Sequence, residues 1–340
     1  MKINRNKLGE LVKDHYLSCR KHPVAHLWIY NYTQKAQYEK LWTPETLMCR
    51  GLIVDQSDNI IARPFNKFFN YEEFKSELPT SNFDVYEKMD GSLGILYWVN
   101  DEPFLATRGA FESEQAIKGT ELLKKYQNLD KLNRNHTYLF EIIYPSNRIV
   151  VDYGAEEKIV LLAIIETETG NELPLESDIF EVVKKYDGIH DLKNIKEKQE
   201  DNKEGFVIKW PDGFRLKLKF DEYVRLHRLV TRVTARSIWD LLRSGQPFDE
   251  LLERVPDEFF SWVKAKKAYF ENEYTQIRLD ADLLVQGCNL ENLSRKEAAM
   301  IIKDHPLSAV VFKLLDKKDV SELIWKMLYP KHEIPFKTEI

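Results

Sequence analysis

The sequence has few of the residues that mark disulfide-rich, metal-ligating or membrane proteins. Its three cysteines (Cys19, Cys49 and Cys288) match no metal-binding spacing, and their odd number argues against a disulfide framework. The eight histidines form no HExxH pattern. The longest apolar run, Ile159 to Ile165, suits a buried strand and is too short to span a bilayer. With a polar start that has no signal-peptide core, these absences predict a cytoplasmic protein in a reducing compartment, without membrane contact.

The chain also lacks an excess of basic charge. Lys and Arg total 50 against 55 Asp and Glu, which gives a net charge of −5 and a pI near 6.0. Nucleic-acid binding would therefore have to depend on a local basic surface. At 340 residues, with 43% hydrophobic and 31% charged, the chain is long enough for two domains with sizeable cores.

Glycine becomes scarce after about residue 222, and this change divides the chain. Before it, short alternating apolar segments bounded by turn residues predict strands, and two longer periodic segments predict helices. We therefore expect an α+β, antiparallel-rich domain over residues 1–222. The strands are expected at His26–Tyr32, Leu52–Asp55, Ile60–Phe65, Phe83–Lys88, Gly94–Val99, Pro103–Thr107, Thr137–Ile143, Lys158–Glu166, Gly205–Trp210 and Phe214–Lys219, and the helices at Ser113–Tyr126 and Pro174–Tyr186.

Residues 223–340 have helical periodicity and are expected to form an all-helical domain. Ser294 with Glu297 fits a capping box, and Pro306 and Pro330 end their segments. The expected helices are Tyr223–Ser244, Phe248–Val255, Pro256–Val285, Ser294–His305, Leu307–Leu315 and Val320–Leu328.

Lys88 lies in the segment EKMDGS, at the end of a predicted strand and just before an Asp-Gly turn. A lysine placed there suits a covalent nucleophile, because glycine lets the backbone approach a bound phosphate. Taken alone, the motif is also an ordinary hairpin turn. Further polar residues recur downstream in order: Glu141 between apolar neighbours, Glu204 before Gly205, and Lys217 alternating with Lys219.

Lys217 and Lys219 share one face of their strand, with leucines on the other. Alternating lysines are also typical of a solvated edge strand. Facing acids from neighbouring strands, however, they predict a site for a polyphosphate and a divalent metal. A lysine that attacks a nucleotide α-phosphate needs in-line positioning and cations that offset the charge of the leaving pyrophosphate.

These segments resemble the nucleotidyl-transferase motifs of polynucleotide ligases and mRNA capping enzymes, and most closely the family of phage T4 RNA ligase 1. The resemblance spans roughly residues 26 to 228 and covers CRGL from Cys49, ARPFNKFFN from Ala62, EKMDGSL from Glu87, Arg108-Gly109, SEQA from Ser113 and YVRLH from Tyr223. Beyond these residues, the C-terminal helices agree with the family only in position and helical character.

The resemblance implies that Lys88 accepts AMP, that Glu141 holds the ribose and that Glu204 acts near a metal. It further implies ATP contacts from six residues: Tyr30, Arg50, Lys67, Phe69, Lys217 and Lys219. Tyr30 and Phe69 could equally be core aromatics of strands. Arg108 stands where the family has a lysine needed for ligation, and arginine keeps the charge but cannot deprotonate. Asp249 is the candidate for a further metal-linked acid.

Four arginines, Arg225, Arg228, Arg232 and Arg236, fall at i, i+3, i+7 and i+11 and predict a stripe on one helical face. One interpretation is a solvated face paired with acids such as Glu222. The other is a phosphate-contacting ridge for RNA.

The expected activity is that of a monomeric, ATP-dependent RNA ligase using Mg²⁺ or Mn²⁺. It would join RNA 5′-phosphate and 3′-hydroxyl ends, with nicked tRNA as a plausible substrate chosen by the helical domain. The alternatives are a DNA ligase or capping-type enzyme, an inactive RNA-binding repair protein, and an adenylylating enzyme with another kind of target.

Overall fold

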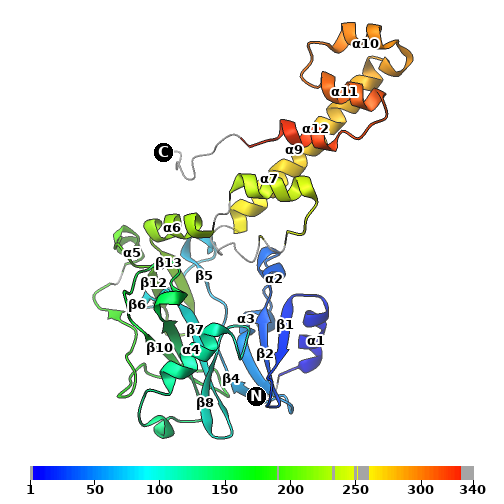
Figure 1. Cartoon of the computed structure of the whole chain (residues 1–340). Coiled ribbons are helices and arrows are strands. Elements are labelled where there is room, and N and C mark those ends of the chain that lie inside the picture. Colours follow the sequence, from blue (N-terminus) through cyan, green and yellow to red (C-terminus); the bar gives the residue numbers. More distant parts are fainter. Residues whose placement is uncertain (1–2, 190, 232–233, 249–250, 252–259, 331–340) are drawn as a thin grey trace. The chain divides into compact units, whose positions relative to one another are not determined.

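The computed structural model describes the chain apart from residues 1–2, 190, 232–233, 249–250, 252–259 and 331–340 (Figure 1). It divides into two compact units, residues 1–231 and residues 232–340. The first unit contains three sheets with helices around them, and all elements described in the second are helical. This confirms the α+β class. Among the described helices, none combines the length and apolar character that crossing a membrane requires.

The first unit is built on three sheets, and all their strand pairs but one are antiparallel. The first sheet has the order β1-β2-β3-β4, with β1 (Leu17–Lys21), β2 (Leu27–Tyr32), β3 (Arg50–Asp55) and β4 (Ile60–Ala62). The second has the order β10-β9-β7-β8, with β7 (Ser92–Val99), β8 (Glu102–Ala106), β9 (His136–Ile143) and β10 (Lys158–Glu166). The third has the order β11-β6-β12-β13-β5, with β5 (Phe69–Asn70), β6 (Asp84–Lys88), β11 (Lys185–Tyr186), β12 (Gly205–Lys209) and β13 (Arg215–Lys219).

The ten predicted strands are all present, with ends shifted by a few residues. The predicted hairpin between β7 and β8 turns at Asn100 and Asp101, both with positive φ, 48° and 68°. This is the backbone that a two-residue hairpin turn requires. The second predicted hairpin, β12 with β13, pairs in register from Gly205 opposite Lys219 to Lys209 opposite Arg215.

Buried side chains join the sheets into one body. Leu96, Phe140 and Ile142 lie on the face of the second sheet that packs with α4 (Glu114–Leu123). On the opposite face of β9, Leu139 packs with the first sheet and Ile143 with residues of β6. Glu141 lies between Leu139 and Ile143 in the sequence of β9. Residues two apart in a strand share a face, so its side chain is on the same face as theirs.

Five helices belong to the first unit besides α4, and Figure 1 shows α6 next to the third sheet. Ser113, the first residue of the predicted helix Ser113–Tyr126, caps α4 by accepting from Ala116 N. The remaining helices are α1 (Arg5–Lys13), α2 (Gln34–Tyr38), α3 (Pro44–Met48), α5 (Leu192–Glu197) and α6 (Asp221–Thr231). Short 3₁₀ turns occur at Tyr71–Glu73, Leu129–Lys131 and Pro145–Asn147.

The predicted helix Pro174–Tyr186 is wrong. This segment runs along the edge of the second sheet, where Leu161 N donates to Glu181 O and Val183 N donates to Leu161 O. It then joins the third sheet as β11. The pairing satisfies its backbone groups, so that tertiary context overrides the helical periodicity.

The predicted helix Tyr223–Ser244 is also wrong as one element. It is divided into α6 and α7 (Ala235–Ser244), and Thr234 caps α7 with an extended backbone and a capping box formed with Ser237. The second unit continues with α9 (Phe260–Gly287), a 3₁₀ turn at Leu290–Asn292, α10 (Arg295–Ile302), α11 (Ser308–Leu315) and α12 (Ser321–Met327).

The capping box predicted from Ser294 and Glu297 is present at the start of α10. The core of the second unit is formed by α9 to α12 and includes Ala281, Val310 and Ile324, all fully buried. Most of the predicted helix Phe248–Val255 and the predicted start at Pro256 lie outside the described residues.

Candidate active site

Three charged side chains meet where β6, β12 and β13 lie side by side. Glu204, the residue before β12, accepts through Oε1 from Lys88 Nζ at 2.7 Å and from Lys219 Nζ at 3.0 Å. The Glu204 side chain is 4% exposed, Lys219 10% and Lys88 20%. Lys88 is therefore the member of this cluster that is most open to a ligand from solution.

The register of the third sheet brings these residues together. Gly205 lies opposite Lys88 on one side and opposite Lys219 on the other. Its φ is +143°, and an added Cβ would lie 2.0 Å from Leu218 O. Only glycine permits this close approach of β13 to the residue after Glu204.

Glu204 is an anion in the free protein. Burial alone would raise the pKa of this carboxyl, but the charges of Lys88 and Lys219, with the hydrogen bonds they donate, hold the pKa below its usual value. The carboxylate thus offsets one of the two ammonium charges, and the largely buried cluster keeps a net positive charge.

Glu141 reaches the same region from β9 in the second sheet. Desolvation raises the pKa of Glu141 to about 8; Lys88 opposes the rise, whereas Glu204 and Asp90 add to it. At neutral pH most of this carboxyl is protonated in the free protein. It can then donate a hydrogen bond as well as accept one, which suits contact with a sugar hydroxyl.

Gly91 permits the close approach of the motif that carries Lys88 to β9. A Cβ at this position would lie 2.5 Å from Ile142 O and 3.2 Å from Glu141 Cγ. Contacts under 3.0 Å force the backbone to shift. The glycine of the EKMDGS motif is therefore required where the chain enters β7 close beside β9.

Asp90 of the same motif is buried and binds three donors. Its Oδ2 accepts from Val150 N at 2.9 Å and Val151 N at 2.8 Å, and its Oδ1 accepts from Tyr223 Oη at 2.7 Å. Asp90 was expected only as a turn residue. Its actual role is to hold the loop after β9 and the first turn of α6 beside Lys88.

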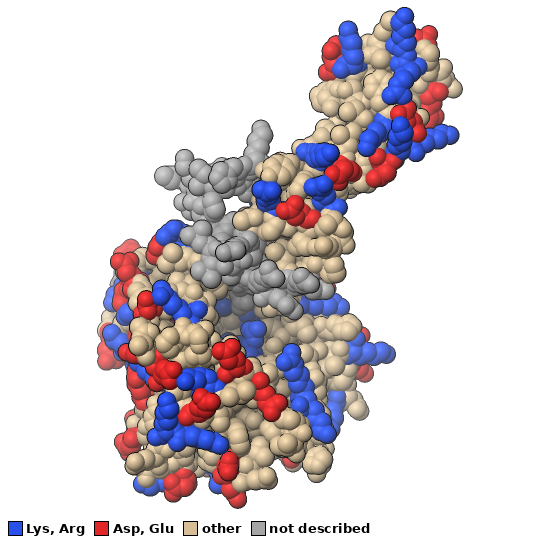
Figure 2. Space-filling view, viewed as in Figure 1, with Lys and Arg blue, Asp and Glu red and all other residues tan. Residues whose placement is uncertain are grey.

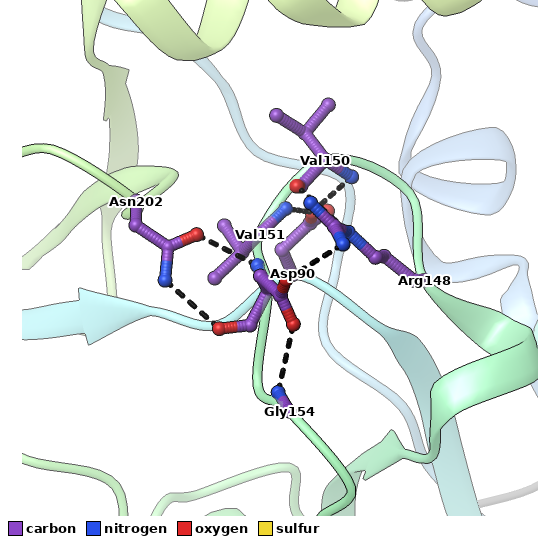
Figure 3. Close-up of polar contacts among 7 residues, drawn as sticks. Asp90, Arg148, Val150, Val151, Gly154 and Asn202 are labelled. Carbon is purple, nitrogen blue, oxygen red and sulfur yellow. Dashed lines mark hydrogen bonds and ion pairs between the residues drawn. The ribbon is translucent and has the colours of Figure 1, made fainter.

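The loop after β9 is tied further to the segment before Glu204. Asn202 Oδ1 accepts from Asp152 N, and Asn202 Nδ2 donates to Asp152 O, at 2.7 Å and 2.8 Å (Figure 3). Arg148 Nη1 donates to Asp152 Oδ2 at 2.7 Å, and Gly154 N donates to Asp152 Oδ1. This network links the loop that Asp90 binds to the segment that carries Glu204.

A second group of predicted residues gathers around Tyr32 and Trp42. The ammonium of Lys67 lies 5.5 Å from the ring centre of Tyr32 and 5.6 Å from those of Trp42 and Phe69. Arg108 lies 5.4 Å from the Tyr32 ring centre and donates a long 3.5 Å hydrogen bond to its hydroxyl. A cation over an aromatic face is attracted by the electron density of the ring, so these contacts stabilise Lys67 and Arg108 in their positions.

Tyr30 does not join this group. It is 5% exposed in the core of the first sheet with Leu52 and Cys49, and desolvation raises its pKa. The neighbouring aromatic that does contact Lys67 and Arg108 is Tyr32, which was not among the predicted site residues. The repeated tyrosine in IYNYT was the available signal, but spacing could not separate the two, because both lie on one face of β2.

Arg50 begins β3 and lies 5.8 Å from the ring centre of Phe68, and its charge lowers the pKa of Glu141. Lys217 lies in β13 opposite Val207. Direct contacts therefore join Lys88, Glu204 and Lys219, while the ATP-binding roles of Arg50, Lys67, Phe69 and Lys217 stay predictions.

The predicted arginine stripe is wrong as a single helical face, because Arg225 lies in α6 and Arg236 in α7. Arg225 donates to both carboxylate oxygens of Glu222, and Arg236 pairs with Asp240 at 3.9 Å. Arg228 lies in α6, and Arg232 lies outside the described residues, as does the candidate metal-linked acid Asp249.

The described residues contain no group of three or more His, Cys, Asp or Glu side chains that could hold a metal ion by themselves. Mg²⁺ is commonly bound by one or two carboxylates together with substrate phosphates and waters. Glu204 fits this kind of site, because its buried anionic carboxylate lies beside the predicted nucleophile and already binds two cations.

Comparison with known proteins agrees with this arrangement. The model of the RNA ligase family of the T4 RNA ligase 1 type matches residues 48–224, just over half of the chain. A protein of Autographa californica nuclear polyhedrosis virus, named as a bifunctional polynucleotide kinase/RNA ligase, is 28% identical over 285 residues. A protein of Thermovibrio ammonificans, named as an RNA ligase, is 30% identical over 211 residues.

The first match covers 73% of this chain and 40% of the viral protein, and the second covers 56% of this chain and 55% of the bacterial one. The chain thus spans about half of the length of these curated relatives. A solved structure named as an ATP-dependent DNA ligase from Aquifex aeolicus has a TM-score of 0.50 at 15% identity, over 93% of this chain and 88% of that one. This likeness shows a shared ligase fold. With the family match covering Lys88, Glu141, Glu204, Lys217 and Lys219, the chain belongs to the RNA ligase family of the T4 RNA ligase 1 type.

Proposed function

We propose that the chain is an ATP-dependent RNA ligase that joins 5′-phosphate and 3′-hydroxyl ends through a covalent AMP adduct on Lys88. The observation that carries this proposal is the cluster of Lys88, Glu204 and Lys219. It presents a partly exposed lysine at a strand end beside a buried acid and a second cation. Phosphoryl transfer depends mainly on positioning and charge of this kind.

The reaction has three in-line transfers. First, the neutral amine of Lys88 attacks the α-phosphorus of ATP, an N–P bond forms, and the bond to the β-phosphate oxygen breaks with release of pyrophosphate. Second, a 5′-phosphate oxygen of RNA attacks the same phosphorus and Lys88 leaves as an amine. Third, a 3′-hydroxyl attacks the activated 5′-phosphate, which forms the phosphodiester and releases AMP.

The residues around Lys88 have distinct roles in this scheme. Lys217 and Lys219 offset charge on the α-phosphate and the leaving pyrophosphate, and Glu141 holds the ribose. Arg50, Lys67 and Phe69 shape the ATP pocket, and Arg108 supplies charge for the sealing step. A divalent cation such as Mg²⁺ or Mn²⁺, when bound, would add positive charge at the phosphates and compete with Lys88 for Glu204.

In this proposal the helical second unit selects the RNA substrate, and nicked tRNA is the candidate. Figure 2 shows Lys and Arg interspersed with Asp and Glu over the visible face of the described residues. This mixture, with the net charge of −5, favours recognition by a few local arginines over a broad basic field.

A DNA ligase or a capping-type enzyme would be expected to carry a β-rich domain after the lysine strand. All elements that the structure describes after β13 are helices, which favours the RNA ligase. The solved relative from Aquifex aeolicus is named as a DNA ligase, so that the choice of nucleic acid needs its own measurement.

The test uses α-labelled ATP with the wild-type protein and with Lys88→Ala. We expect a labelled protein band only for the wild type, and circularisation of a 5′-phosphorylated RNA but not of the matched DNA strand. Labelling of Lys88→Ala would refute the assignment of the nucleophile. Adduct formation without RNA sealing would instead indicate an adenylylating enzyme with another target.

A further inference from the structure

Asn70 is a buried polar residue whose side chain makes no hydrogen bond to the described part of the chain. It is 2% exposed, and neither its Nδ2 nor its Oδ1 has a hydrogen-bond partner among the described residues. Buried amides are nearly always paired, because an unpaired one loses its bonds to water and gains nothing in return. A group that is left unpaired in the free protein is a candidate for contact with a ligand.

The local backbone does not use this side chain either. Asn70 occupies the N-cap position of the 3₁₀ turn Tyr71–Glu73, where asparagine commonly accepts a backbone N–H. No such side-chain bond is present. Capping therefore does not account for an asparagine here.

The register of the third sheet places Asn70 on the face that carries the active site. β5 pairs with β13 in parallel, with Asn70 opposite Lys217. Lys217 in turn lies opposite Val207, and Val207 lies opposite Tyr86. Side chains directly opposite one another in a ladder share a face. Asn70 thus belongs to a row that runs across the sheet beside Lys217.

The next row on the same face contains the reacting group. Two residues further along each strand, the row consists of Lys88, Gly205 and Lys219. The opposite face is occupied by Val85, Phe206 and Leu218 of the hydrophobic core. Asn70 is therefore on the polar side of the sheet, one row from the proposed nucleophile.

We infer that Asn70 binds a phosphate group of a substrate, with its Nδ2 donating to a phosphoryl oxygen next to Lys217. The inference rests on the proposed ligase function. The phosphate could belong to ATP or to the 5′ end of RNA, and the chemistry is the same in both. An amide donor adds direction to the charge that Lys217 supplies, since a lysine ammonium binds phosphate as a point charge.

The variants Asn70→Leu and Asn70→Asp separate this role from a structural one. Leucine has a similar size and removes an unpaired amide, so Asn70→Leu is expected to unfold at the same or a higher temperature than the wild type. Asn70→Asp keeps the shape but replaces the donor with an anion that repels phosphate. The matched control is Thr137→Val, since Thr137 is fully buried and accepts from Arg63 N at 2.9 Å.

Two reactions are measured for each variant with Mg²⁺ present: labelling of the protein over a series of ATP concentrations, and sealing of a pre-adenylylated RNA. In Asn70→Leu we expect either the ATP concentration for half-maximal labelling to rise or the sealing rate to fall, in each case roughly ten- to hundred-fold. The change should be larger in Asn70→Asp. A defect in labelling identifies the phosphate as that of ATP, and one confined to sealing identifies it as that of RNA. Thr137→Val is expected to lose thermal stability and to keep both reactions.

Wild-type kinetics in both Asn70 variants would overturn the inference, and so would a loss of thermal stability as their only change. If the wild type itself formed no AMP adduct, the proposed ligase function would be refuted. This outcome is distinguishable from failure of the Asn70 inference, in which the wild type forms the adduct and the variants behave like it. The Lys88→Ala protein supplies the blank for labelling.

Discussion

Lys88 Nζ and Glu204 Oε1 lie 2.7 Å apart, so that the proposed nucleophile is bound to a buried acid in the free protein. Lys219 binds the same oxygen from the other side. The amine of Lys88 can attack only after this ion pair is released. The binding of ATP with a divalent cation would supply the competing charge that releases it.

Glu204→Gln is expected to lower the free energy of unfolding by about 3 kcal/mol, because it leaves the largely buried ammonium of Lys219 and the partly exposed one of Lys88 without their counter-charge. The same change should abolish the AMP adduct. Urea unfolding at pH 7 measures the first effect. Glu222→Gln, at an exposed ion pair with Arg225, is the control and should leave stability unchanged. Equal stability of Glu204→Gln and the wild type would show that the cluster contributes nothing to folding.

The raised pKa of Glu141 predicts a pH dependence of stability. Its folded-state value of about 8 lies above its ordinary value of 4.5, so that between these pH values the folded protein binds more protons than the unfolded chain. The free energy of unfolding should therefore fall as pH rises from about 5 through 8, by up to about 1.4 kcal/mol per pH unit. Glu141→Gln cannot titrate and should show a flatter profile in urea unfolding. Parallel profiles would contradict the buried, protonated state.

Gly91→Ala should destabilise the protein by about 1–3 kcal/mol, because the new methyl group would lie 2.5 Å from Ile142 O and the chain entering β7 would have to move away from β9. The rate of adduct formation should fall with it. Gly9→Ala is the contrasting change, since Gly9 lies in α1 with no atom within 4 Å of the added Cβ. It should raise stability by about 0.5–1 kcal/mol. Thermal unfolding of both variants measures these changes in stability.

Tyr223→Phe removes the hydroxyl that donates to Asp90 Oδ1 at 2.7 Å and should cost about 1–3 kcal/mol of unfolding free energy. Because Asp90 holds the motif of Lys88, labelling with ATP should slow as well. Tyr16→Phe, whose hydroxyl donates to the exposed Glu39, should change neither quantity. Wild-type labelling by Tyr223→Phe would show that Asp90 does not depend on this bond.

If α6 contacts RNA, the double substitution Arg225→Glu and Arg228→Glu should weaken RNA binding and reduce its salt dependence, while self-labelling with ATP stays intact. Filter binding over a series of salt concentrations provides the measurement. An unchanged salt slope would favour the interpretation that these arginines only pair with acids, as Arg225 does with Glu222.

In the third sheet, period-two alternation and turn residues predicted each strand that carries a proposed site residue, with the exception of β5. The alternation of Lys217 and Lys219 with leucines is strong because one face is core and the other carries the proposed site. β5 has only two residues, too few for a periodic signal. The helix prediction for Pro174–Tyr186 failed for another reason. This segment bonds to Leu161 of β10 and then joins β6, which lies far earlier in the chain, and no local pattern reports such partners.

The site was predictable where charge repeats at strand ends and unpredictable where a side chain acts on the backbone. Lys88 and Glu204 stand out as charges beside apolar strands. Asp90 looks like a turn residue in sequence, since its two backbone donors come from residues about 60 positions away. Tyr30 and Tyr32 are equivalent by spacing, and only the packed structure shows which one meets Lys67.

The bond between Tyr223 and Asp90 also bears on how the chain can be shortened. The change in composition near residue 222 invites a fragment that ends there, and such a fragment would lack the phenol that Asp90 binds. A fragment that extends to residue 231, where the first compact unit ends, keeps it. The smallest piece that can form the nucleotide site therefore includes α6, although every proposed AMP- and ATP-contacting residue precedes it.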